Sequence, residues 1–83
     1  MAKVLVVEDN IDLRENMKWA LKSDYEVFEA GSSLECMETF SRVRPDVVCL
    51  DMGLDNIPEK GLELINEILL NDRSAKIIVI TAN

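Results

Sequence analysis

The sequence predicts an α/β domain built on a parallel sheet with helices on both faces. Short apolar runs alternate with segments whose apolar residues recur every three or four positions, and these patterns are typical of strands and amphipathic helices. The resulting order, β-α-β-α-β-α-β, favours parallel strands joined by right-handed crossovers. The carboxyl ends of all four strands then lie along one edge of the sheet, which is where open sheets of this kind bind ligands.

Four segments are predicted to be strands, and they cover residues 3–7, 25–30, 47–50 and 76–80. Three of them are nearly continuous apolar runs, as expected of strands that are buried on both faces. The second, YEVFEA, alternates apolar and polar residues, which predicts a half-exposed strand. Asp51 ends the most apolar run, because a buried strand does not tolerate an unpaired charge.

Two helices are predicted between the first three strands. For the first, Asn10 or Asp9 is a suitable N-cap, and Trp19 is expected to pack rather than bind a ligand. For the second, Ser32 and Glu35 form a capping box, and the pair Arg44–Pro45 ends the helix. The residues expected to face the core are Leu13, Met17, Ala20 and Leu21 in the first helix, and Leu34, Cys36, Met37 and Phe40 in the second.

A third helix is predicted after Gly61, following a polar loop over residues 53–60. Asn71 and Asp72 are expected to close it. The side predicted to face the core carries Leu62, Ile65, Ile68 and Leu69.

Composition narrows the class of protein. The 83 residues are 48% hydrophobic and 30% charged, which is typical of one small globular domain. The net charge of −7 argues against nucleic acid or a membrane surface as the main partner of this segment, and no apolar run approaches the ~20 residues needed to span a bilayer. Cys36 and Cys49 are not spaced as a CxxC pair, so we expect buried thiols in a reducing cytoplasm. The absence of histidine excludes a Ser-His-Asp triad, histidine zinc ligands and a phosphohistidine carrier.

Polar side chains follow three of the predicted strands. Glu8 and Asp9 come after the first strand, Asp51 after the third and Thr81 after the fourth. Three carboxylates at one sheet edge repel one another unless a cation lies among them. Mg²⁺ is the natural cation, because it prefers oxygen ligands and accepts one or two carboxylates, a backbone carbonyl and waters. The site would then hold Mg²⁺ beside a carboxylate able to attack phosphorus.

Four segments in this order, VLVVEDN, VVCLDMGL, GLELI and IIVITAN, resemble the receiver domain of bacterial two-component response regulators. The resemblance covers the whole chain. It implies a flavodoxin-like (CheY-like) doubly wound sheet with strand order 2-1-3-4, in which a fifth strand would follow. It also implies a phosphoacceptor that receives its phosphoryl group from a sensor histidine kinase and catalyses only its own phosphorylation and dephosphorylation.

The resemblance also implies roles for single residues. Asp51 is the expected phosphoacceptor, and Glu8 and Asp9 are the acidic pair that holds Mg²⁺. Met52 supplies a backbone carbonyl ligand, and Thr81 is the switch hydroxyl. Two further positions, Gly53 and Asn83, match those that tune how long the phosphoryl group persists.

The sequence departs from the receiver pattern at three places. Asp55 stands where receivers usually carry Pro, and Gly61 lies two residues later than usual. The longer loop resembles receivers attached to AAA+ transcription activators, which suggests a C-terminal AAA+ and DNA-binding output domain in a longer protein. Residues 1–83 hold three βα units and a fourth strand, so we expect an incomplete receiver that lacks the fifth strand with its phosphate-binding Lys and the last helices. We therefore expect poor phosphorylation of this chain, and a dimer or domain swap through the exposed fourth strand.

Other classes fit less well. A receiver-like interaction module that is not phosphorylated remains the main alternative. A phosphatase or phosphotransferase with an aspartyl nucleophile commonly carries a second Asp two residues later, where this chain has Gly53. A dinucleotide-binding domain would carry GxGxxG after its first strand, and a flavin site would need a hydroxyl- and Gly-rich loop in place of EDNID.

Overall fold

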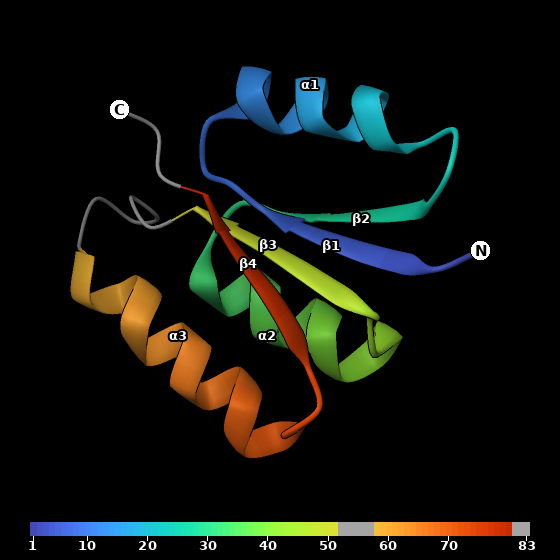
Figure 1. Ribbon diagram of the computed structural model, residues 1–83. Helices are drawn as coiled ribbons and strands as arrows, with labels where there is room; N and C mark the ends of the chain where they lie inside the picture. The colour runs from blue at the N-terminus through green and yellow to red at the C-terminus, as the bar shows by residue number, and fades with distance from the viewer. Residues whose placement is uncertain (52–57, 81–83) are drawn as a thin grey trace.

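The computed structural model describes residues 1–51 and 58–80, and it contains one parallel sheet flanked by helices. The strands lie in the order β2-β1-β3-β4, with helix α1 on one face and helices α2 and α3 on the other (Figure 1). This confirms the predicted fold class and strand order. The elements are β1 (Lys3–Val7), α1 (Ile11–Leu21), β2 (Glu26–Ala30), α2 (Ser33–Val43), β3 (Val47–Asp51), α3 (Pro58–Asn71) and β4 (Lys76–Ile80).

The register of the two central strands positions the acidic residues. Val7 of β1 pairs with Leu50 of β3, so Glu8 and Asp51 follow at neighbouring places at the carboxyl edge of the sheet. β1 is buried from Val4 to Val7, as its continuous apolar run predicts. The strand pairing that buries the most apolar side chains therefore also brings the carboxylates together.

Each face of the sheet has its own apolar core. The larger core lies between the sheet and helices α2 and α3, and Phe40 and Ile68 are its largest helical members. The smaller core lies under α1, where Met17 and Leu21 pack against Val4, Val6 and Cys49. Alternate residues of β1 and β3 thus enter opposite cores, as the period of two in a strand requires.

Two helix starts follow the predicted chemistry. Asn10 caps α1, and its side chain accepts a hydrogen bond from the backbone N–H of Leu13 at 3.0 Å. Ser32 caps α2 and accepts from the N–H of Glu35 at 3.2 Å. The Glu35 carboxylate reaches back to the N–H of Gly31 at 3.3 Å, one residue earlier than in the usual capping box. At the other end, α2 stops at Val43, before the pair Arg44–Pro45 as predicted, and Arg44 adopts the left-handed conformation (φ 55°).

Some predicted boundaries and helix faces were wrong. α3 begins at Pro58 rather than after Gly61, since proline fits the first position of a helix. β2 begins at Glu26, and Tyr25 lies outside it. Five apolar residues that were predicted to face the core are exposed: Leu13, Ala20, Leu34, Leu62 and Leu69.

The true core contacts differ from the predicted ones in two helices. Leu64, which was not predicted, is 3% exposed, because α3 turns the 64/68 face toward the sheet. Trp19, predicted to pack, is 63% exposed, and the Lys22 ammonium lies 3.6 Å from its ring centroid. Cys36 and Cys49 are free and buried as predicted, and burial raises the pKa of the Cys36 thiol to about 12.

Within residues 1–51 and 58–80, no helix is long and apolar enough to cross a bilayer. Among the described strands, β4 is paired on one side only, with β3. Its Ile78 is 54% exposed and its Val79 is 44% exposed, so apolar side chains remain open on both faces of this strand. An apolar edge strand with unpaired backbone groups is a template for another strand.

We predict that the 83-residue chain self-associates through β4. Multi-angle light scattering at micromolar concentration should give a mass above that of the monomer, and Ile78→Lys should restore the monomer by placing a charge on the edge strand. Leu70→Lys is the matched control, since Leu70 is 85% exposed but lies on α3. A monomeric wild-type chain under these conditions would contradict the prediction.

Candidate metal centre

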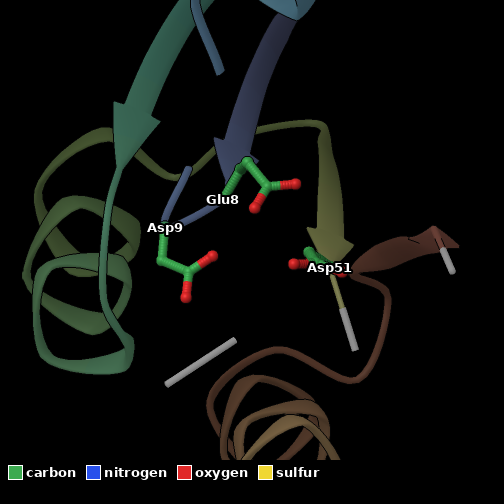
Figure 2. Close-up of side chains that lie close together, drawn as sticks. All are labelled: Glu8, Asp9 and Asp51. Carbon is green, nitrogen blue, oxygen red and sulfur yellow. The ribbon is translucent and has the colours of Figure 1, made fainter. Parts of the chain in front are cut away.

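Three carboxyl groups meet at the carboxyl edge of the sheet. Glu8 and Asp9 directly follow β1, and Asp51 is the last residue of β3. Figure 2 shows the three side chains around one space, each coming from the end of a central strand. One oxygen of each carboxyl group lies within 4.8 Å of the others. The prediction that Glu8, Asp9 and Asp51 converge is thus confirmed by the geometry.

Two of the predicted site residues lie outside the described residues. Met52 and Thr81 fall in the ranges 52–57 and 81–83, as do Gly53, Asp55 and Asn83. Their expected roles therefore stay predictions.

Short-range hydrogen bonds fix the turn that carries the acidic pair. The Glu8 N–H extends the β1–β2 ladder by donating to the Ala30 carbonyl at 3.0 Å. The Glu8 carboxylate accepts from the Asn10 N–H at 3.2 Å, and Asn10 in turn caps α1. The chain therefore passes from strand to helix in three residues, all of them polar, and the first two supply carboxylates.

The carboxyl group of Glu8 is strongly perturbed. It is buried (4% exposed), and this desolvation is the main reason why its pKa rises from 4.5 to about 7. The N–H of Asn10 opposes the rise, whereas hydrogen bonding with Asp9 and Asp51 and the charge of Asp51 add to it. Asp51 is also buried, at 9% exposed. The fully ionised state of the cluster is therefore energetically unfavourable when no cation is bound.

This donor set fits a hard divalent cation. All three side chains offer oxygen, and no Lys or Arg side chain in the described part of the chain forms an ion pair with Glu8 or Asp9. A cation at this place would remove both the repulsion and the unfavourable burial of charge. Glu8, Asp9 and Asp51 would hold it.

Sequence reasoning missed one residue that touches the site. Arg14 of α1 donates from Nη1 to the main-chain carbonyl of Glu8 at 3.0 Å. A signal was present, because residues 14, 17 and 21 share one helix face and that face is the one turned toward the sheet. A cation on the inward face of an amphipathic helix indicates an internal partner.

The fold and the acidic cluster together define a receiver-type α/β domain with a candidate metal site at the carboxyl edge of its sheet. A profile of the response regulator receiver domain matches residues 4–83. Chemotaxis protein CheY of Listeria monocytogenes is 38% identical over 84 residues, which cover 99% of this chain and 69% of that protein. Transcriptional regulatory protein PhoP of Escherichia coli is 37% identical over 96% of this chain and 35% of its own length.

Among solved structures, response regulator protein TrrA of Thermotoga maritima, in complex with Mg(2+)-BeF, superposes with a TM-score of 0.89 at 36% identity. The match covers all of this chain and 71% of that one. The chain belongs to the response regulator receiver domain family. This confirms the resemblance seen in the sequence motifs.

The raised pKa of Glu8 predicts an unusual pH dependence for the metal-free protein. The folded state holds a proton on Glu8 between pH 4.5 and about 7, whereas the unfolded state releases it near pH 4.5. The folded state thus binds more protons across this window, so stability falls as the pH rises through it. In EDTA, Glu8→Gln should remove this loss and raise the free energy of unfolding at pH 7.5 by on the order of 2 kcal/mol.

Urea unfolding at pH 4.5 and pH 7.5 checks this prediction. Glu15→Gln, which removes a carboxylate from the exposed side of α1, is the matched control and should keep the wild-type difference between the two pH values. A Glu8→Gln variant that is less stable than the wild type at pH 7.5 in EDTA would show that the Glu8 carboxylate is not unfavourably buried.

Proposed function

We propose that this domain is a phosphorylation-controlled switch in which Asp51 accepts a phosphoryl group and Mg²⁺ is the cofactor. The observation that carries the proposal is the convergence of Glu8, Asp9 and Asp51, with oxygens within 4.8 Å, at the carboxyl ends of the two central strands. Asp51 lies where a nucleophile is best held, since it is the last residue of a buried strand and its position is fixed by pairing with Ile80.

The transfer needs a carboxylate, a phosphoryl donor and charge neutralisation. A carboxylate oxygen of Asp51 forms a bond to phosphorus while the bond between phosphorus and an imidazole nitrogen of the donor breaks, and the nitrogen keeps the electron pair. Bound Mg²⁺ would neutralise charge on the phosphoryl oxygens and the carboxylates. Hydrolysis of the acyl phosphate returns Asp51 and inorganic phosphate. We propose that the domain's catalysis is limited to these two steps, so that it is a signalling phosphoacceptor rather than an enzyme with an external substrate.

Two residues complete the proposed chemistry. The Met52 carbonyl would add a ligand to Mg²⁺, and the Thr81 hydroxyl would hydrogen-bond the phosphoryl group and report its presence. Both assignments rest on the match of VVCLDMGL and IIVITAN to the receiver motifs.

The proposed phosphoryl donor is a sensor histidine kinase, and the proposed location of this domain is the cytoplasm. Membership of the receiver family supports this choice of donor. The relative TrrA is in complex with Mg(2+)-BeF, which supports Mg²⁺ as the cofactor. We further propose a transcriptional output, carried by an AAA+ and DNA-binding part of a longer chain. The similarity to PhoP, a transcriptional regulatory protein, supports that output, whereas the similarity to chemotaxis protein CheY is compatible with a different one.

The experiment is intact-mass measurement after incubation with acetyl phosphate and Mg²⁺. We expect a gain of one phosphoryl group that is lost in Asp51→Asn and after chelation of Mg²⁺ by EDTA. Asp46→Asn is the matched control, because Asp46 precedes the same strand at its opposite end, where it accepts a hydrogen bond from the Lys3 N–H at 2.7 Å. The gain should be small for this chain and larger for the longer parent chain that the sequence predicts.

The outcomes separate the candidate functions. Gain by the parent chain alone places essential chemistry beyond residue 83. No gain in either chain, with Mg²⁺ shown to bind, favours an interaction module that is not phosphorylated. A gain that persists in Asp51→Asn would place the phosphoacceptor at another residue.

A further inference from the structure

Arg14 connects α1 to the end of β1 and to β2, beside the Glu8–Asp9 turn of the candidate metal site. Its Nη1 donates to the Glu8 carbonyl at 3.0 Å, and its Nε lies 3.4 Å from a carboxylate oxygen of Glu29 on β2. The second contact is an ion pair rather than a hydrogen bond, since the buried Nε has no hydrogen-bond partner in the described part of the chain. The guanidinium is thus held by its charge on one side and by a directed hydrogen bond on the other.

The Glu8 carbonyl lies directly after β1, where the pairing of β1 with β2 ends. The N–H of the same residue still bonds the Ala30 carbonyl, but beyond it the β2 chain turns away into α2. A buried carbonyl without a partner is costly, so the guanidinium replaces the missing strand donor. Its contact therefore fixes the peptide between Glu8 and Asp9, the two adjacent carboxylates.

A glycine makes room for this contact. A Cβ at Gly31 would lie 2.6 Å from Nη1 of Arg14 and 3.6 Å from its Cζ. Gly31 does not have a positive φ, so the backbone there accepts alanine, and the side chain of alanine would meet the guanidinium. Two contacts, to Glu8 and Glu29, together with the space that Gly31 leaves open, thus specify one place for the guanidinium.

We propose that Arg14 is a positioning residue of the metal centre, which holds the Glu8–Asp9 peptide so that both carboxylates face Asp51. This inference deepens the proposed function and rests on it for the identity of the ion. Groups that orient metal ligands commonly contribute tenfold or more to metal affinity. We therefore expect Arg14→Met to weaken Mg²⁺ binding by about tenfold.

The sign of the effect distinguishes positioning from simple charge. Removal of a positive charge near the site would strengthen the attraction for Mg²⁺, whereas loss of the positioning contact weakens binding. Lys18→Met is the matched control. Lys18 pairs with the same Glu29 carboxylate at 3.6 Å and carries the same charge, and no contact joins it to the Glu8 carbonyl. It should leave Mg²⁺ affinity unchanged or slightly increase it.

A second variant tests the same contact with Arg14 in place. Gly31→Ala should push the guanidinium away from the Glu8 carbonyl and weaken Mg²⁺ binding in the same direction as Arg14→Met. The double variant should bind Mg²⁺ no more weakly than Arg14→Met alone, because both substitutions remove the same contact, from Arg14 to the Glu8 carbonyl. Additive losses would overturn the proposal, and so would a Gly31→Ala protein with wild-type affinity.

The measurements are Mg²⁺ titration by calorimetry and the carbonyl-carbon NMR resonance of Glu8 in the metal-free protein. The resonance should shift in Arg14→Met and Gly31→Ala and stay in place in Lys18→Met. If the wild-type chain binds no Mg²⁺, the proposed cofactor fails, while the resonance still tests the Arg14 contact. If the wild type binds Mg²⁺ and Arg14→Met binds it equally well, the positioning role fails and the proposed function stands.

Discussion

The close approach of the carboxyl groups of Glu8, Asp9 and Asp51 at a partly buried site is the physical constraint on which the rest of this structure depends. Two of these side chains are buried, and their oxygens lie within 4.8 Å of the third. Such an arrangement is unfavourable without a cation: burial is the main reason why the pKa of Glu8 is raised, and the neighbouring carboxyl groups of Asp9 and Asp51 add to the rise. It persists because the pairing of β1 with β3 buries apolar side chains on both faces of the sheet and leaves the acidic residues no alternative place. The free energy of hydrophobic burial thus keeps the three carboxyl groups close together even before a cation binds.

The supports of this site come from the periphery of the sheet rather than its centre. β2 supplies Glu29, the turn after β2 supplies the space at Gly31, and α1 supplies Arg14 and the Asn10 cap. These contacts bear on the Glu8–Asp9 turn, whereas Asp51 is the last residue of β3 and pairs with Ile80 of β4. The Glu8–Asp9 side of the site is therefore supported by side chains from a helix, and the backbone pairing of the sheet places Asp51 on the other side.

The sequence was most informative where a local pattern has one physical solution. Continuous apolar runs followed by acidic residues identified the strands, the carboxyl edge and the three carboxylates, because burial excludes the alternatives. Helix faces were harder, since Leu34, Leu62 and Leu69 are as apolar as Leu64 and the pattern alone does not say which side meets the sheet. Pro58 was read as part of a loop although proline also begins helices. Arg14 was missed although it shares a helix face with Met17 and Leu21, because no residue type in the sequence marks a main-chain carbonyl as its partner.

The sequence contains no histidine, and the Glu8 carboxyl group instead titrates in the pH range where histidine usually does. With a pKa of about 7, its carboxyl group is close to half protonated at neutral pH in the metal-free protein. Any cation that binds there must displace this proton, which passes to the solvent. The heat of binding therefore contains the ionisation heat of the surrounding buffer. Titrations in buffers of different ionisation enthalpy would count the protons that the acidic cluster releases when the cation binds.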